Sequence, residues 1–165
     1  MSFFRKLFGS KKEPPGDSGG PMPSRSLKLP FAPVPENGAS LANVFAQAVL
    51  RIDQAELDYS VASLEFVDQF LERFRREGLS VNDCAETIFV AGCYVGQVMV
   101  NQCNGNWVRQ EEAGLPEGVT MMPSVVKLPG GTIADPIAKA FKRFYYGESD
   151  SIFYFYQVFT NEDKV

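Results

Sequence analysis

Residues 80–107 read Ser-Val-Asn-Asp-Cys-Ala-Glu-Thr-Ile-Phe-Val-Ala-Gly-Cys-Tyr-Val-Gly-Gln-Val-Met-Val-Asn-Gln-Cys-Asn-Gly-Asn-Trp, and this stretch decides the fold. Between Ile88 and Val100 the apolar side chains cover about two thirds of a helical circumference. A helix with so wide an apolar surface must be covered by other elements on most sides. We therefore expect a central buried helix around which the rest of the chain packs.

The start of this helix is marked by a capping box. The Ser80 hydroxyl can accept a hydrogen bond from the amide of Asp83, and the Asp83 carboxylate can accept one from the amide of Ser80. Leu79 and Cys84 stand at the positions of a hydrophobic staple. The spacing predicts that the helix begins directly after Ser80.

Gly92 and Gly96 lie inside the apolar run, where each costs about 1 kcal/mol relative to alanine. Close packing of a neighbouring element against the bare backbone would explain them. A membrane-spanning dimer helix is the alternative, but the run is shorter than the roughly 20 residues that a bilayer requires, and Asn and Gln flank it. We expect close helix packing in a soluble core.

A narrow polar stripe interrupts the apolar surface of the helix. Its members are Asp83, Thr87, Tyr94, Gln97, Asn101 and Asn104. Tyr94, Gln97 and Asn101, together with Trp107 at the head of the sheet, are the candidate binding site. Buried polar groups need partners, and a ligand edge is one such partner. The alternative is internal hydrogen bonding to the turn at residues 104–106 or to the connector at residues 58–60.

The composition limits the chemistry that the chain can perform. Its 165 residues include 14 Phe, 6 Tyr and one Trp, enough for a core of large side chains, but no His, the commonest general base and metal ligand. Cys84, Cys93 and Cys103 are 9 and 10 residues apart, so they point to different sides of the helix. We expect neither a disulfide nor a metal site, no cofactor, and thiols kept reduced in the cytoplasm.

The charge is unevenly distributed along the chain. Residues 1–35 hold 6 basic and 2 acidic residues, whereas residues 36–165 hold 10 basic and 18 acidic residues, a net charge of −8. Phosphate contacts require a basic face, so an acidic body argues against a nucleic-acid partner. The same acidity suits a basic protein partner.

Residues 1–12 form a basic amphipathic N-terminal tip. The residues expected to contact a membrane or partner are Phe3, Phe4, Arg5, Lys6, Leu7 and Phe8. The tip has no secretory h-region or cleavage site, and Ser2 excludes myristoylation. A helix this short is marginal in water, so the tip is either a solvated tail or a weak contact with a partner or an anionic, peripheral membrane surface.

Residues 13–36 contain seven prolines up to Pro35 and are expected to form a Pro/Gly-rich linker, since proline blocks both helices and sheet ladders. The alternative is an irregular strap along the body. The residues that would face the body in that case are Leu27, Leu29, Phe31 and Val34.

Residues 37–160 are predicted to fold as a single α+β domain, mostly helical, with an antiparallel sheet of two or three strands. We expect a first helix from Asn37, a second capped by Ser60 and closed by Gly78, and another after Asp135-Pro136. Strands are expected at residues 107–109 and, interrupted by Pro123, at residues 119–128, with the sheet ending at residues 129–132. Residues 152–159 suit a helix or a strand, and we favour the helix.

Three motifs follow one another along residues 57–159. They are Leu-Asp-Tyr-Ser at 57–60 with Ser63, Leu64 and Asp68; Gly-Cys-Tyr-Val-Gly-Gln-Val at 92–98 with Gly105 and Trp107; and Lys-Arg-Phe at 142–144 with Gly147, Asp150-Ser-Ile at 150–152 and Phe-Tyr at 155–156. In this order they resemble a family of small uncharacterised bacterial domains, a domain of unknown function. The resemblance implies the fold and a cytoplasmic setting but no reaction. The family usually carries Glu at the position of Gln97, so a carboxylate role there does not carry over.

The expected function is that of a non-catalytic protein-interaction module, of an inhibitory or immunity type, with an unknown protein partner. Two alternatives stay open: a small-molecule binding protein or unrecognised hydrolase using Tyr94, Gln97 and Trp107, and a structural component of an envelope-associated assembly. Catalysis is not expected, because no histidine can activate a serine or cysteine. A deep pocket at those three residues would favour the ligand alternative, and a flat acidic face with exposed aromatic residues would favour the protein partner.

Overall fold

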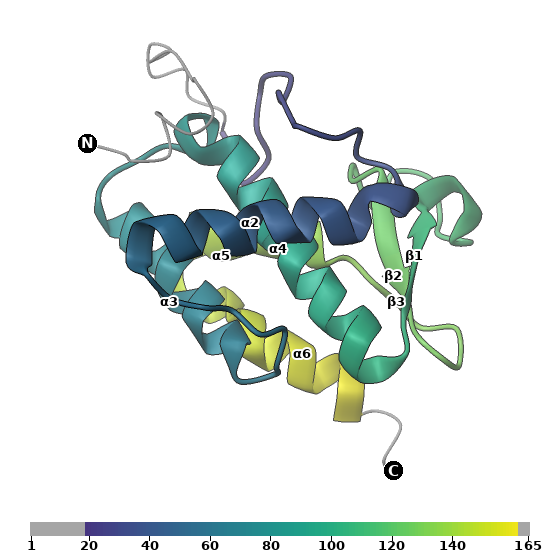
Figure 1. Cartoon of the computed structure of the whole chain (residues 1–165). Coiled ribbons are helices and arrows are strands. Elements are labelled where there is room, and N and C mark those ends of the chain that lie inside the picture. Colours follow the sequence, from purple (N-terminus) through teal and green to yellow (C-terminus); the bar gives the residue numbers. More distant parts are fainter. Residues whose placement is uncertain (1–18, 162–165) are drawn as a thin grey trace.

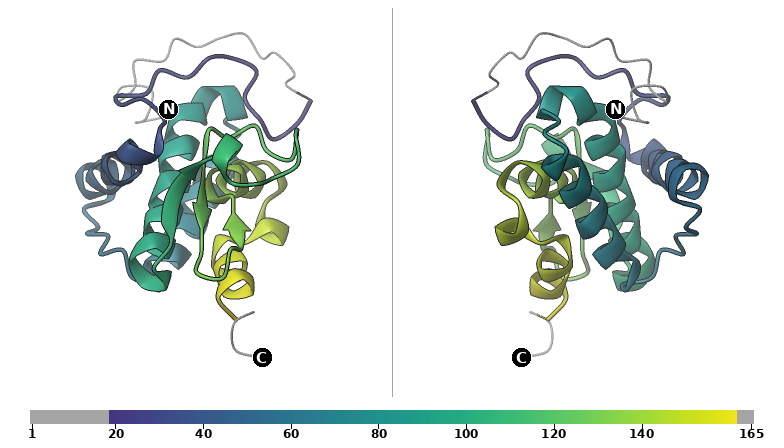
Figure 2. Two further views of the ribbon diagram at one scale, coloured as in Figure 1. Left: turned by 90° about the vertical axis from the view of Figure 1, so that its right-hand side faces the viewer. Right: turned by 90° about the vertical axis from the view of Figure 1, so that its left-hand side faces the viewer.

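A long helix, α4 (Val81–Cys103), passes through the middle of the molecule, with α2 (Gly38–Asp53) and α5 (Pro136–Tyr146) on opposite sides of it (Figures 1 and 2). This computed structural model describes residues 19–161, so the expected N-terminal tip at residues 1–12 lies outside the described residues. The described part also contains α3 (Ser63–Arg76) and α6 (Ile152–Asn161), and the 3-10 helices η1 (Pro35–Asn37), η2 (Gln110–Glu112) and η3 (Glu148–Asp150).

The start of α4 is the predicted one. Ser80 Oγ accepts from the Asp83 amide at 3.1 Å, and Asp83 Oδ2 accepts from the Ser80 amide at 3.0 Å, so both halves of the capping box are formed. The side chains from Ile88 to Met99 are almost all buried, which confirms the central buried helix. Within residues 19–161, no helix combines the length and the hydropathy that crossing a bilayer demands.

The glycines of α4 lie where other elements approach its backbone. A Cβ placed on Gly92 would lie 2.5 Å from the Cα of Ile137, so α4 and α5 cross there at backbone distance. A Cβ on Gly96 would collide with the indole of Trp107, and so would one on Gly38 of α2. The predicted close packing is therefore confirmed, and Trp107 lies between two bare backbone positions.

A three-stranded antiparallel sheet, in the order β1-β2-β3, packs beside one end of α4. Its strands are β1 (Asn106–Arg109), β2 (Ser124–Lys127) and β3 (Ile133–Ala134), with Trp107 opposite Val126 and Val126 opposite Ala134. The expected strand at residues 119–128 is correct only for β2. Before it, Pro123 has no amide proton to donate to a neighbouring strand. The Thr120 hydroxyl donates to Asp135 and accepts from the Met122 amide, so residues 120–122 form a local turn and not a strand.

The loop at residues 129–132 is a hairpin rather than the end of the sheet. Gly130 and Gly131 have φ values of 91° and 93°, which glycine adopts without strain, and the Leu128 amide donates to the Thr132 carbonyl at 2.8 Å. The chain therefore turns back and adds β3 to the free edge of β2. Sheet size was predicted correctly, but the end of the sheet was placed one strand too early.

Two helix starts depend on serine hydroxyls. α3 begins at Ser63, later than expected, although Ser60 Oγ still accepts from the Ser63 amide at 3.2 Å. α6 is a helix, as favoured from the sequence, and Ser151 Oγ accepts from the Tyr154 amide at 3.2 Å. The chain is a mostly helical α+β domain, as predicted.

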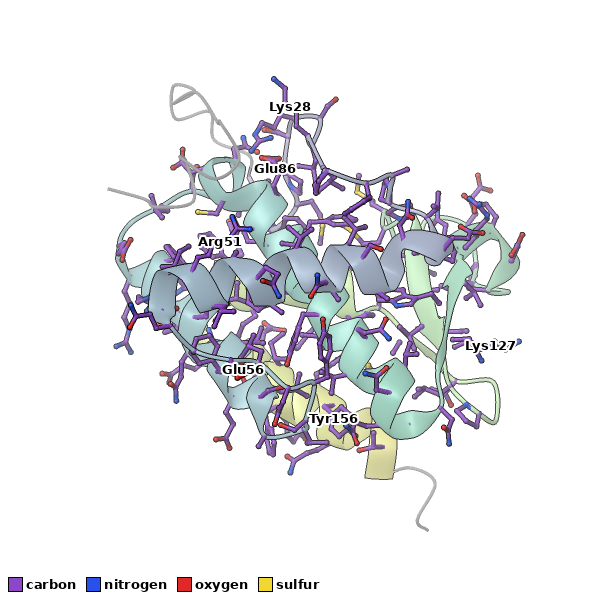
Figure 3. The ribbon with its side chains drawn as sticks, viewed as in Figure 1. Lys28, Arg51, Glu56, Glu86, Lys127 and Tyr156 are labelled. Atoms are coloured by element: carbon purple, nitrogen blue, oxygen red, sulfur yellow. The ribbon has the colours of Figure 1, made fainter. Side chains whose placement is uncertain are left out.

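Residues 19–34, which we call the strap, run across the upper end of the body in Figure 1. Leu27 and Leu29 pack against the core, as the strap alternative for this part of the linker requires. Arg25 fixes the strap to α4: its guanidinium donates to both carboxylate oxygens of Glu86 at 2.7 Å and to the carbonyl oxygen of Asn82. Glu86 points from α4 toward the strap (Figure 3), and its side chain is 4% exposed.

We expect Gly92→Ala to lower the free energy of unfolding by about 1–3 kcal/mol, because the added methyl group must push α5 away from α4. Urea denaturation followed by far-UV circular dichroism measures this change. Gly20→Ala is the matched control, since nothing lies within 4 Å of a Cβ there, and its effect should stay within about 0.5 kcal/mol. A Gly92→Ala protein more stable than the parent, as helix propensity alone would give, would contradict the close crossing.

Candidate functional site

The predicted site divides into two parts. Gln97, Asn101 and Trp107 do come together: Trp107 Nε1 donates to Gln97 Oε1 at 3.1 Å, and Gln97 Nε2 donates to Asn101 Oδ1 at 2.9 Å. These three side chains thus satisfy much of each other's hydrogen-bonding capacity. The void that Trp107 lines measures about 10 Å³, which is room for one water molecule at most.

Tyr94 belongs to a different network. Its hydroxyl accepts from the Tyr59 amide at 2.9 Å and donates to Ser63 Oγ at 2.7 Å, because the single Ser63 hydroxyl proton is used on the Ser60 carbonyl at 2.6 Å. The Tyr94 ring is fully buried and lies against the rings of Tyr59 and Phe45. Burial raises the pKa of Tyr94, so the phenol stays protonated. Tyr94 therefore fastens the connector to α4, as the internal alternative anticipated.

A buried ionic network was missed by sequence reasoning. Arg143 of α5 is 4% exposed and donates to Asp68 at 2.9 Å and to Glu72 at 2.7 Å. The Asp68 carboxylate also accepts from the amides of Ile152 and Phe153 at 2.7 and 3.0 Å. Arg143 therefore joins α5 to α3, and Asp68 caps the start of α6. The Glu72 pKa is lowered mainly by its hydrogen bond to Arg143.

The most site-like cavity lies between the strap and the loop at residues 119–123. It has a volume of about 490 Å³, and its floor includes Phe89 of α4 and Phe141 of α5. Ser26 is the single residue with a polar side chain that lines it, and the other lining side chains are hydrocarbon, aromatic ring or thioether. We call this cavity the strap groove. Its main apolar walls are Met22, Leu27, Phe31, Phe89, Met121 and Met122.

Two residues at the mouth of the strap groove are unusually exposed for apolar side chains. Met121 is 77% exposed and Phe31 is 44% exposed. Phe31 and Leu29 also line a second hollow of about 620 Å³, on the α2 side of the strap, where Lys28 and Arg51 lie (Figure 3). The strap therefore borders a hollow on each side. The hollow beside residues 119–123 is the strap groove, and the one beside α2 also contains the polar side chains of Lys28 and Arg51.

Sequence reasoning did not point to the strap groove. Phe31 was considered only as part of a possible strap, and Met121 and Met122 were assigned to a strand. The available signal was their composition: two adjacent methionines before Pro123, beside a segment already known to carry Leu27, Leu29 and Phe31. Methionine is common on surfaces that adapt to several apolar partners.

Searches of protein-family models, of curated proteins and of solved structures give no match to this chain. The resemblance based on the three motifs therefore stays a prediction. In residues 19–161, no group of three or more Cys, Asp or Glu residues has the geometry of a metal site.

We predict that Tyr94→Phe lowers the free energy of unfolding by about 1–3 kcal/mol, since the Tyr59 amide and the Ser63 hydroxyl lose their buried partner. Hydrogen exchange of the Tyr59 amide should accelerate in parallel. Tyr154→Phe is the matched control, because Tyr154 is 66% exposed. Equal stability of the two variants would contradict the fastening role of Tyr94.

Arg25→Ala should release the strap and cost about 2–3 kcal/mol of stability, because Glu86 would remain buried without its cation. Arg25→Lys keeps the charge but loses the two-pronged contact, so its cost should be smaller. Hydrogen exchange of residues 19–34 together with urea denaturation measures both effects. Unchanged protection of the strap in Arg25→Ala would show that the ion pair does not hold it.

Proposed function

We propose that this chain is a non-catalytic protein-interaction module that binds an apolar segment of a partner protein in the strap groove. The observation that carries the proposal is an open apolar cavity of about 490 Å³ with Met121 exposed at its mouth. Small-molecule sites of this size normally contain several convergent polar groups that orient the ligand. The strap groove has one polar lining residue, so it suits apolar anchor side chains from a longer segment.

The chemistry that we propose for the partner follows from the charge of the body. The loop that supplies Met121 and Met122 also carries Glu111, Glu112 and Glu117, all exposed, and none of these three forms an ion pair within residues 19–161. Residues 36–165 carry a net charge of −8. This acidic body favours a basic amphipathic segment, whose apolar face enters the groove.

A non-catalytic role is supported by what the carboxylates already do. Asp83 completes the capping box of α4, Glu86 binds Arg25, and Asp68 caps α6. None of them is left as a free acid or base in a cavity, and the chain has no histidine. An inhibitory or immunity-type protein, which covers a basic surface of its target in the cytoplasm, is the role that we propose for this module.

The test uses the full chain and a fluorescent twelve-residue peptide of Leu and Lys arranged as an amphipathic helix. We expect the double change Phe31→Ser and Met121→Ser to weaken binding at least tenfold, since each lost apolar contact is worth about 1.5 kcal/mol or more. Fluorescence anisotropy measures the affinity. Tyr154→Ser, an equally polar change at an exposed residue of α6, should leave it unchanged.

Two outcomes would count against the proposal. One is equal affinity of the double variant and the parent protein, which would place binding elsewhere. The other is equal affinity for a peptide of the same composition with its residues shuffled, because attraction between charges alone does not require an apolar face.

A further inference from the structure

We propose that the strap groove is occupied in the resting protein by the chain's own N-terminal tip, residues 1–12, which a partner segment must displace. This inference rests on the proposed function of the groove and adds its regulation. The structure describes the chain from residue 19 onward, and Met22, three residues later, lines the groove. The groove therefore opens beside the point where the preceding segment joins the body.

The tip has the composition that the groove selects. Its apolar residues are Phe3, Phe4, Leu7 and Phe8, spaced to share one face of a short helix, and its cations are Arg5, Lys6, Lys11 and Lys12. The side chains that line the groove are apolar except for Ser26, and residues 36–165 carry a net charge of −8. A segment of basic residues around aromatic side chains is thus complementary to the groove in hydropathy and to the acidic body in charge.

The tether is long enough for the tip to fold back. Thirteen residues separate Phe8 from Met22, and an extended chain spans about 3.3–3.6 Å per residue, so the tip can reach every part of a groove that Met22 borders. A short tether gives an effective concentration on the order of millimolar. A tip with only micromolar-to-submillimolar intrinsic affinity would therefore fill the groove within one molecule. The tip of a second copy would compete for the groove only at the bulk protein concentration, which is lower than this effective concentration.

The methionines provide a direct readout in the full-length protein. Met22, Met121 and Met122 line the groove, whereas Met99 is fully buried in α4 and does not line it. In protein labelled with ¹³C at the methionine methyl groups, we expect the Met121 and Met122 signals to move when Phe3, Phe4, Leu7 and Phe8 are all changed to Ser. The Met99 signal should stay in place, which also confirms that the variant is folded.

The matched control changes Lys11 and Lys12 to Gln, which leaves the apolar face intact and should shift the same signals less. Signal positions that are independent of protein concentration over a tenfold range support docking within one molecule. Positions that change with concentration would overturn the intramolecular form, because the occupant would then be the tip of a second copy. Unmoved Met121 and Met122 signals in the quadruple Ser variant would overturn the proposal altogether.

Binding of the Leu/Lys peptide separates this inference from the function on which it rests. If the tip competes for the groove, the quadruple Ser variant should bind the peptide about tenfold more tightly than the parent chain. Equal and groove-dependent binding by both proteins would reject the resident tip and leave the interaction module standing. Methionine shifts without peptide binding by either protein would support the resident tip and reject the partner site.

Discussion

The backbones of α4 and α5 cross at Gly92, and the positions of most other elements follow from that crossing. Ile137 can approach α4 this closely only because position 92 has no side chain. The crossing places Pro136 and Asp135 at the edge of the sheet, where Asp135 caps α5 through the Ala138 amide and receives the Thr120 hydroxyl. A loop that would otherwise be unrestrained is therefore held next to the helix start. The two adjacent methionines follow directly in that loop.

Trp107 has a comparable role one turn further along the same face of α4. Its indole lies against Gly96 and Gly38, so α2, α4 and β1 meet around one large side chain. The side-chain carbonyl of Gln97 accepts a hydrogen bond from the indole N–H, and the Gln97 side-chain NH₂ group donates one to Asn101. The N–H of this partly buried tryptophan finds its hydrogen-bond acceptor in the polar stripe. The stripe is best understood as the means by which the sheet is fixed to the helix.

The helical part of the fold could be predicted because its signals are local. The capping box at Ser80, the Asp135-Pro136 start and the period of the apolar residues each specify their element without reference to the rest of the chain. The interior glycines also predicted a close helix crossing, although not its partner. The strands were harder, since β3 contains two residues and exists only because the glycine hairpin returns the chain to β2.

The site was only partly predictable, for the same reason. The pairing of Gln97 with Asn101 follows from their spacing of four residues on α4, whereas the bond from Tyr94 to the connector depends on how residues 54–62 pass over α4. Arginine usually lies at the surface, and only the arrival of Asp68 and Glu72 from α3 explains the burial of Arg143. The groove needs the strap, whose course is set by a pair 61 residues apart in the chain.

The cap that Asp68 provides for α6 joins residues 84 positions apart. Such a pairing raises the contact order of the domain, because the N-terminus of α6 gains its cap only when it reaches α3. Arg143 can pair with Asp68 before that, but the amides of Ile152 and Phe153 then lack this carboxylate. One buried side chain thus connects two parts of the domain that are far apart in sequence.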